Sequence, residues 1–521
     1  MLQNLLYVAA PKQSLLVRQA LDRMGATPIV AQAGVPSQPG HYSAELAHPL
    51  LGKMVLQIDV VDNIDIITPH LKQHAVDLLI YDERGGMEAR AALSRIKADV
   101  AAFAELWGPD FVFPMSRVVA ILGTVHNDAQ RAFELGRIGA RDVCVAPENT
   151  AQVLRFLARV LRHGILREPR IGMAMSGGGL EGFLYQVGVL RALERAMTGR
   201  SLHGCHVYSG VSSGAIASAL LAGGIEVGET IRALHRRSDR LGPIGSNMLF
   251  DVAGWNILRR IVGESMTWSG LSPQKLINQT LRSIPTGLFK GDQLEDYFKR
   301  ALEKEGKGNR FEDLDAELYL GATDQDSFEH VVFGKAPWEN VPISAAIRAS
   351  VALPPIFLPK QINGRYFIDG QVTRTCNLEL VIERGCRLVM IIDPIRPYGS
   401  GLPGTVDGHG GVFGMIQVIK ALVYSRFQLV LSHAAERYPD VDFIVFQPDE
   451  ECAKIMSGSP MRYKIRTQLI ELAYISTLRK LRERHQVYAA KLSRYGFTLA
   501  TADRLHELEM DTAEIASGPP Q

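Results

Sequence analysis

The sequence predicts an α/β protein with more than one domain, and three features lead to this prediction. At 521 residues it exceeds the length that a single hydrophobic core usually supports. Strand-like and helix-like stretches alternate over residues 1–165, which favours a largely parallel sheet. After a basic, proline-containing connector at residues 163–170, a short apolar stretch leads through a glycine run into a helical pattern. This order of elements marks the start of a second α/β domain.

Composition excludes several classes of protein. Hydrophobic residues make up 46% and charged residues 21%, as in a soluble globular chain, and the net charge of +2 provides no general attraction to nucleic acid. The five cysteines are scattered without C-x-x-C spacing, so neither a disulfide framework nor a structural zinc site is expected. The first residues lack the pattern of a signal peptide, and no apolar run reaches the length of a membrane span. We expect a cytoplasmic protein that does not span a membrane.

The N-terminal third is predicted to hold five strands and four helices. The strands are expected at 5–9, 28–32, 76–81, 118–123 and 142–146, and 55–61 either replaces the second strand or adds to the sheet. The helices are expected at 13–24, 87–107, 129–138 and 151–162, the last with Asn149 or Thr150 as N-cap. Residues 34–52 are rich in proline and glycine and are expected to form an inserted loop.

This domain, residues 1–165, resembles a response-regulator receiver domain of flavodoxin-like fold. The resemblance rests on residues 77–82, 118–123 and 133–143. It implies that Asp82, at the end of the third strand, occupies the position of the family's phosphoacceptor. The family's acidic pair is replaced by Ala9 and Ala10, and its lysine before proline by Ala146, so the groups that hold a cation and neutralise phosphate are missing. We therefore expect a degenerate receiver that binds a protein partner, with an ordinary strand-end carboxylate as the other interpretation of Asp82.

The second domain contains a G-x-S-x-G sequence at Gly210, Ser212 and Gly214. It lies between the apolar residues from 206 and a run of small residues with helical character, which is the strand-to-helix form of a nucleophile elbow. Glycines permit the tight turn that exposes a serine hydroxyl. Such a pentapeptide arises readily by chance, so Ser212 could also be only a small turn residue. The surrounding sequence must distinguish the two interpretations.

A glycine-rich loop precedes this serine and offers backbone N–H groups to a ligand. Gly177, Gly178, Gly179 and Gly182 follow the apolar residues 171–175 and open the helical pattern of 183–197. Such a loop binds either phosphate or an oxyanion. The spacing fits a dinucleotide fingerprint, but no acidic residue follows the next strand to hold a ribose. Donation from residues 177–179 to the tetrahedral intermediate at Ser212 is the favoured interpretation.

A serine nucleophile needs a base, and the best candidate is Asp369. An apolar strand brings this carboxylate directly to a glycine turn at Gly370. If it contacts Ser212, partial burial would raise its pKa towards a useful range. The histidines at 203, 206 and 330 lie in no catalytic motif and are expected to be structural or exposed.

Together, these elements over residues 170–395 resemble the patatin-like phospholipase family. The family's marks are a glycine-rich loop, a G-x-S-x-G serine and an Asp-Gly turn in this order, and the blocks 317–324 and 345–357 are also similar. The resemblance implies a three-layer α/β/α lipid acyl hydrolase with a Ser212/Asp369 dyad, completed by residues 396–513, without metal or cofactor. Its substrate would be a membrane phospholipid or lysophospholipid, reached by peripheral membrane contact. A catalytically idle signalling module is the alternative.

Three departures from the family pattern accompany the resemblance. Glu181 replaces a basic residue in the glycine loop, Gln371 replaces a small residue after Asp-Gly, and residues 373–378 lack the family's proline. None of these changes removes a member of the dyad.

Four further stretches complete the chain. Residues 248–262 form either an interfacial lid or an amphipathic helix packed on the core. The apolar run 412–431 is expected to be a buried helix or an acyl-chain wall, with the core favoured. A final strand is expected at 441–446, followed over 461–492 by one or two basic helices whose charges face either solvent or an anionic membrane. The tail at 514–521 is expected to be disordered.

Overall fold

The computed structural model describes residues 2–511 except for a set of gaps. These are 24–26, 29–40, 49–51, 74–75, 86, 108–112, 114, 124–127, 165–169, 246–286, 305, 307, 400–403, 410, 439–440 and 458–461. The predicted lid at 248–262 and the predicted disordered tail at 514–521 therefore lie outside the described residues.

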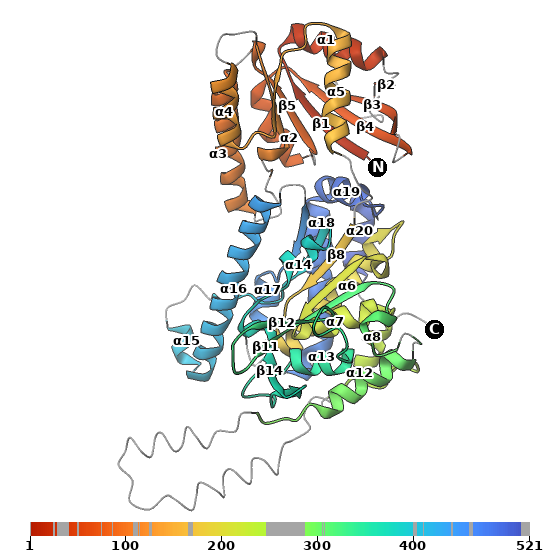
Figure 1. Cartoon of the computed structure of the whole chain (residues 1–521). Helices are drawn as coiled ribbons and strands as arrows, with labels where there is room; N and C mark the ends of the chain where they lie inside the picture. The colour runs from red at the N-terminus through yellow and green to blue at the C-terminus, as the bar shows by residue number, and fades with distance from the viewer. Residues whose placement is uncertain are drawn as a thin grey trace, which may run out of the picture.

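The N-terminal part is built on a seven-stranded sheet in the order β2-β3-β4-β1-β5-β6-β7 (Figure 1). Its strands are β1 (Leu2–Val8), β2 (Thr27–Pro28), β3 (His41–His48), β4 (Gly52–Val61), β5 (Leu78–Asp82), β6 (Val118–Leu122) and β7 (Asp142–Val145). The strands from β4 to β7 in this order are parallel, while β2 and β3 are antiparallel additions beyond β4. Five parallel strands with the first one second in order form the flavodoxin-like arrangement.

Helices cover both faces of this sheet. On one face α1 (Pro11–Arg23) and α5 (Thr150–Gly164) pack around Tyr7, Leu21 and Leu157. On the other, α2 (Ile67–Gln73), α3 (Ala89–Trp107) and α4 (Asp128–Ile138) enclose Leu93 and Leu135. Asn149 accepts a hydrogen bond from the Gln152 N–H at 3.0 Å, so it is Asn149 that caps α5.

Most elements predicted for this part are confirmed to within a few residues, and two differ. Of the predicted strand 28–32, residues 29–32 lie outside the described residues. Residues 41–48 form strand β3, whereas a loop was predicted over 34–52. Tyr42, Ala44 and Leu46 alternate with polar residues, a strand period that the flanking prolines and glycines outweighed in the prediction. Residues 55–61 lie in an additional strand of the sheet, which was one of the two predicted alternatives. Helix α2 was not predicted.

The second part contains an eight-stranded sheet in the order β13-β14-β11-β10-β8-β15-β16, with β12 also paired to β11. Its strands are β8 (Arg170–Met175), β10 (Val207–Val211), β11 (Glu317–Asp324), β12 (His330–Phe333), β13 (Lys360–Ile362), β14 (Arg365–Asp369), β15 (Cys386–Ile392) and β16 (Asp442–Phe446). The five strands from β11 to β16 are parallel. Because the carboxyl ends of parallel strands meet at one edge, the loops after β8, β10 and β15 come together there.

This sheet lies between two layers of helices (Figure 1). Met173, Met175 and Met390 pack in the core that includes residues of α6 (Gly179–Ala196), α7 (Ser213–Ala222), α8 (Val227–Leu234) and α18 (Arg466–Glu483). Ala174 and Val389, which point the opposite way along the same strands, pack with α14 (Leu378–Glu383) and α16 (Gly411–Arg437). The predicted three-layer α/β/α class is confirmed.

Smaller elements complete this part of the chain. They are β9 (Met197–Thr198), which pairs with β17 (Thr498–Leu499), and the helices α12 (Asp292–Lys304), α13 (Ile343–Ser350), α15 (Thr405–Gly408), α17 (Glu450–Ile455), α19 (His485–Ser493) and α20 (Ala502–Met510). Several basic side chains of the predicted helices over 461–492 form ion pairs or hydrogen bonds with other residues of the chain. For example, Arg479 and Arg482 pair with Glu509, and Lys480 donates to the Val445 carbonyl.

A buried ion cluster joins the two sheets. Arg494, after α19, contacts Asp77 just before β5 at 2.8 Å and Asp442 at the start of β16 at 2.8 Å. Arg117, just before β6, reaches the same Asp442 at 3.2 Å. Burial opposes ionisation of Asp442, but the two arginines hold the pKa of its carboxyl below the ordinary value. Loss of one partner would leave a buried charge, so this cluster fixes how the two parts contact each other.

Helix α16 differs from its prediction in burial. The run 412–431 was predicted to be a buried helix or an acyl-chain wall, with the core favoured. It forms helix α16, but one face of this helix is open. Met415, Val418, Ile419, Leu422 and Leu429 are 52–67% exposed. The helix is apolar around most of its circumference, while only the side with Phe427 and Leu431 meets the sheet. Within the described residues it is also the one helix, over 413–437, whose length and hydropathy are sufficient to cross a membrane.

Candidate active site

Ser212 occupies a strained turn between β10 and α7. Its φ of 55° and ψ of −124° are unusual for a residue with a side chain, and such backbone strain is typical of a nucleophile elbow. The glycines on either side are required by close approach. A Cβ on Gly210 would lie 2.1 Å from the Gly214 carbonyl oxygen, and one on Gly214 would lie 2.2 Å from the Met175 carbonyl oxygen. Steric contact with the backbone therefore requires glycine at both of these predicted turn positions.

Strand register brings Asp369 to Ser212. Val211 lies opposite Gly321 of β11, and Asp369, at the end of β14, pairs with the next residue, Ala322, from the other side. Ser212 Oγ donates a hydrogen bond to the Asp369 carboxylate, and the Gln371 N–H donates a second one at 2.8 Å. The structure therefore places the two predicted dyad residues in contact, although they are far apart in the sequence.

Burial perturbs the Asp369 carboxyl. The residue is 1% exposed, and desolvation raises its pKa to about 6, against the lowering effect of the hydrogen bonds from Ser212 and the Gln371 N–H. At neutral pH the carboxylate is still mainly ionised and able to accept a proton. A pKa close to the working pH is what general base catalysis favours.

The three histidines considered as bases make other contacts. His203 Nδ1 bonds the Leu221 carbonyl, and His206 Nδ1 accepts from the Ile171 N–H. His330 bonds Thr373 and Asn377, and burial lowers its pKa to about 4, so its ring is neutral. Each described contact is structural.

The glycine loop starts helix α6 beside the serine. Gly178 is the N-cap and Gly179, with φ of +65°, begins the helix, so the N–H groups of this turn lack acceptors within the helix. A Cβ on Gly177 would lie 2.6 Å from Ser212 Cβ, and one on Gly182 would lie 3.1 Å from Ser213 Oγ. The loop and the elbow are thus packed against each other. This proximity suits the predicted oxyanion site, and the helix N-terminus favours negative charge there.

Two serines that the prediction did not single out support this site. Ser350 Oγ accepts a hydrogen bond from the Ser212 N–H at 2.8 Å and donates to the Gly321 carbonyl at 2.6 Å. Ser176, directly before the glycine loop, donates to Asp393, whose other oxygen accepts from Gln447 at 2.9 Å. Burial raises the pKa of Asp393 to about 6. Ser176 directly follows β8 and Asp393 directly follows β15. This position at the carboxyl ends of two strands was a sequence signal that could have identified the pair.

A polar network below the dyad links the turn to the elbow strand. His330 bonds Asn377 at 2.8 Å, and Asn377 donates to Ser209 at 3.1 Å, three residues before the nucleophile. Thr373 joins His330 to Thr323, which in turn donates to the Asp369 carbonyl at 3.0 Å. Through Ser209 and the Asp369 carbonyl, this network contacts the two strands that carry the dyad residues.

The side chain of Gln371 lies over the glycine loop. A Cβ on Gly177 would lie 2.4 Å from Gln371 Cδ, so the amide and Ser212 share the space above this glycine. Gln371 Nε2 is buried and has no hydrogen-bond partner in the structure. The residue that departs from the family pattern thus narrows the approach to the serine.

Gln371→Ala is expected to widen that approach. Because the amide fills space beside Ser212, its removal should raise kcat/KM for bulky acyl esters by roughly three- to tenfold and leave short esters little changed. Initial rates across a chain-length series measure this, with the exposed neighbour Val372→Ala as control. A fall of about a hundredfold would instead indicate that Nε2 donates to the transition state.

Glu181, the other departure in the loop, is neutralised within the protein. It is 1% exposed and its carboxylate accepts from Arg462 Nε at 2.7 Å. Burial raises the pKa of Glu181, while Arg462 and Lys420 act against that rise. The acidic residue therefore contributes no exposed charge beside the loop.

The carboxylate of Asp82 is buried and bound by an arginine of the same chain, Arg84. The residue is 3% exposed, and Arg84 bonds both of its carboxylate oxygens, with Nε 2.9 Å from Oδ1 and Nη2 2.5 Å from Oδ2. Arg84 also donates to the Pro147 carbonyl at 2.9 Å, next to the position where receivers have lysine. The positive charge beside Asp82 therefore comes from the Arg84 guanidinium, which binds the carboxylate directly.

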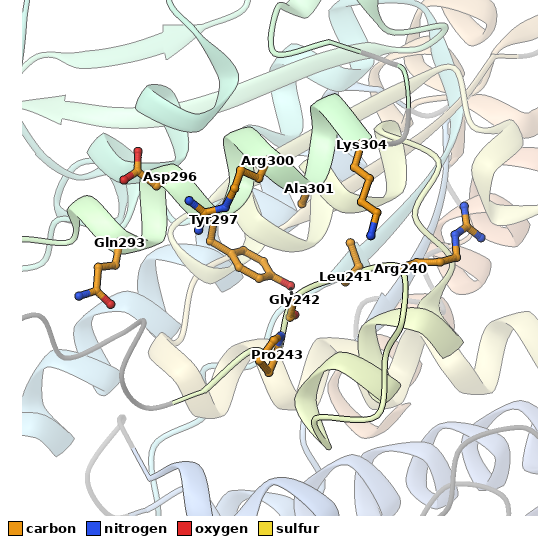
Figure 2. A pocket seen from close by; sticks show the side chains of 10 residues that line it. All are labelled: Arg240, Leu241, Gly242, Pro243, Gln293, Asp296, Tyr297, Arg300, Ala301 and Lys304. Atoms are coloured by element: carbon orange, nitrogen blue, oxygen red, sulfur yellow. Dashed lines mark hydrogen bonds between the residues drawn. The ribbon is translucent and has the colours of Figure 1, made fainter.

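A separate pocket of 520 Å³ lies away from these groups (Figure 2). The loop 240–243 and helix α12 line it, with Arg240, Tyr297, Arg300 and Lys304 among the side chains drawn. Tyr297 donates to the Gly242 carbonyl at 2.9 Å across it. None of its lining residues belongs to the dyad or the glycine loop.

The layers and the strained serine turn define a three-layer α/β/α hydrolase domain. Residues 173–382 match the family model of patatin-like phospholipases, which supports a lipid hydrolase function for this part of the chain. The match includes Ser212, Asp369 and the glycine loop.

Solved structures with some similarity include three proteins. VipD from Legionella pneumophila is 14% identical over 67% of this chain and 81% of that chain, with a TM-score of 0.27. ExoU, in its complex with SpcU from Pseudomonas aeruginosa, is 18% identical over 68% and 59%, with a TM-score of 0.28. NtrX from Brucella abortus is 12% identical over 100% and 84%, with a TM-score of 0.19.

Proposed function

We propose that the chain is a serine lipid acyl hydrolase of phospholipase A or lysophospholipase type, with Ser212 as nucleophile and Asp369 as base. The observation that carries the proposal is the hydrogen bond from Ser212 Oγ to a buried carboxylate whose pKa burial raises to about 6. A histidine is not needed when the base contacts the nucleophile directly. Residues 170–395 would contain the site and residues 396–513 would complete the domain.

In acylation, Ser212 Oγ attacks the ester carbonyl and its proton passes to Asp369. The carbonyl oxygen becomes an oxyanion, which the N–H groups of residues 177–179 would stabilise at the N-terminus of α6. When the tetrahedral intermediate collapses, the bond to the alcohol breaks and Asp369 returns the proton to the leaving oxygen. A fatty acyl group then remains on the serine.

In deacylation, water attacks the acyl-enzyme carbonyl and gives a proton to Asp369. Collapse of the second intermediate breaks the bond to Ser212 Oγ, which recovers its proton from Asp369, and a fatty acid leaves. The carboxyl thus acts as base and then as acid in each half-reaction. A pKa near 6 suits both roles at neutral pH.

For the N-terminal part, residues 1–165, we propose a role in contact with a protein partner and not in phosphoryl transfer. The bidentate Arg84 contact to Asp82 supports this, because the carboxylate is buried and already paired with a guanidinium. The cluster of Arg494, Asp77 and Asp442 offers a physical route by which such contact would reach the hydrolase sheet.

Labelling with a fluorophosphonate tests the proposed hydrolase. An activated serine beside an oxyanion site should form one covalent adduct, located at Ser212 by mass spectrometry, and Asp369→Asn should slow it at least about a hundredfold. Heat-denatured protein is the control. If folded protein formed no adduct at Ser212, the alternative of a catalytically idle signalling module would be favoured.

A further inference from the structure

Ser176 connects strand β8 to the glycine loop, and each of its polar groups has a hydrogen-bond partner. Its N–H donates to the Ile392 carbonyl at 3.0 Å. Its carbonyl accepts from Gln186 Nε2 of α6, and its hydroxyl donates to Asp393 Oδ1. The residue is 0% exposed. Both the backbone and the side chain directly before Gly177 are therefore held in place.

The carboxylate of Asp393 depends on this serine in turn. Its Oδ2 accepts from Gln447 Nε2 at 2.9 Å, and the Ile395 N–H approaches Oδ1 at 3.4 Å. Burial disfavours the ionised form of Asp393, and the hydrogen bonds from Ser176, Gln447 and the Ile395 N–H counteract that effect. Loss of the Ser176 hydroxyl would leave Oδ1 with only the longer of its two contacts.

Pro394, the next residue along the chain, packs against the glycine loop itself. A Cβ on Gly178 would lie 2.8 Å from Pro394 Cγ, and one on Gly182 would lie 3.1 Å from the same atom. The loop also meets the nucleophile, because a Cβ on Gly177 would lie 2.6 Å from Ser212 Cβ. The loop therefore contacts both the end of β15 and the nucleophile, so a shift at the first changes the alignment at the second.

Alignment of the loop matters because oxyanion donors act over hydrogen-bond distances. The N–H groups of residues 177–179 would need to lie about 3 Å from the oxygen that becomes negative. A displacement of about 1 Å is enough to lower a rate strongly. The described hydrogen bonds of the Asp393 side chain reach neither Ser212 nor Asp369. Its influence on the reaction therefore passes through Ser176 and the loop.

We propose that Asp393 is a positioning residue for the oxyanion site, and that it acts by holding the Ser176 hydroxyl so that the N–H groups of residues 177–179 face Ser212. This role rests on the proposed function, because it concerns an oxyanion formed during ester hydrolysis. Neither Ser176 nor Asp393 contacts the reacting atoms. The proposal predicts a defect in stabilising the tetrahedral intermediate and not in binding the ester.

Ser176→Ala tests this role, because it removes the hydroxyl and keeps the Cβ. On a soluble short-chain ester we expect kcat to fall about tenfold while KM changes by less than about twofold, since misaligned donors weaken transition-state binding and not ground-state binding. Ser218→Ala is the matched control. Ser218 is also 0% exposed, its Oγ has no hydrogen-bond partner in the structure, and the variant should behave like the wild type.

An alkyl trifluoromethyl ketone probes the same site without turnover. Ser212 Oγ adds to its carbonyl carbon, the serine proton passes to Asp369, and the carbonyl oxygen becomes an oxyanion. In Ser176→Ala its inhibition constant should rise by about the same factor as kcat falls, because both report the oxyanion site. A merely structural role would lower the melting temperature without moving the two constants together.

Variants of Asp393 show whether the two residues act as a unit. Asp393→Asn keeps an oxygen that accepts from Ser176 and should stay within about threefold of the wild type, whereas Asp393→Ala should lower kcat at least about tenfold. The double variant Ser176→Ala/Asp393→Ala should lose much less than the product of the two single losses, because groups that act through one contact are not additive.

The outcomes separate this role from the proposed function. Unchanged constants in Ser176→Ala, a fall in kcat with an unchanged inhibition constant, or an Asp393→Asn variant as slow as Asp393→Ala would each overturn the positioning. Ser176→Ala decides the question even if Asp393→Ala does not fold. A wild type that neither hydrolysed esters nor bound the ketone would overturn the proposed function as well, whereas an active wild type beside an equally active Ser176→Ala would overturn only the positioning.

Discussion

Ser212→Ala is expected to lower ester hydrolysis by about 10,000-fold or more while the protein stays folded. No other nucleophile is proposed for the acyl transfer, so what remains is the rate that a bound ester reaches with water. The fold should persist because the methyl group keeps the Cβ and loses only the hydrogen bond to Asp369. Initial rates on a soluble ester, together with the melting temperature by circular dichroism, measure both effects.

Ser213→Ala is the matched control for this substitution. Its hydroxyl is also buried, it follows the nucleophile directly, and its Oγ has no hydrogen-bond partner in the structure. Activity should stay within a few-fold of the wild type, because its backbone N–H is unchanged. Full activity of Ser212→Ala, or an equal loss in both variants, would show that Ser212 is not the nucleophile.

Much of the fold could be predicted because both parts follow simple hydrophobic periods. The strands of the first sheet are short apolar runs between helical patterns, and they were located to within a few residues. Strand β3 was missed because its alternation lies between prolines and glycines, so pairing with β4 and not local preference determines its structure.

The site could be predicted where chemistry imposes local rules. The strained turn at Ser212 requires Gly210 and Gly214, and the order of loop, serine and Asp-Gly turn is visible in the sequence. The groups that hold the dyad, such as Ser350 and Asn377, could not be found in this way. Their role depends on strand register, which brings together residues more than a hundred positions apart.

For helix α16 the favoured prediction of a core helix was wrong on one face, for a related reason. Hydrophobic composition predicts that residues avoid water, but it does not say whether a protein core or another apolar phase covers them. With Phe427 against the sheet and Leu422 exposed, the helix divides its apolar residues between two environments.

Asp369→Asn is expected to cause a loss of activity comparable to that of Ser212→Ala, because an amide cannot accept the serine proton. In the wild type, kcat/KM should fall tenfold per pH unit below about pH 6, where the carboxyl is protonated, and be level above it. The residual rate of the variant should lack this acid limb. A variant that kept the limb at a reduced rate would indicate that another group is the base.

Stability distinguishes this catalytic role from a structural one. Burial raises the pKa of Asp369, so the folded protein holds a proton more tightly than the unfolded chain, and the ionised carboxylate costs stability above the unfolded pKa. The free-energy contribution of the group is favourable at low pH and is lost as the pH rises from about 4 through about 6. At pH 8 the free energy of unfolding of Asp369→Asn should therefore equal or exceed that of the wild type, by up to about 3 kcal/mol. This advantage should disappear in acid. Urea unfolding at both pH values measures the difference, and a variant that is both inactive and strongly destabilised at pH 8 would mean that Asp369 serves the fold and not the reaction.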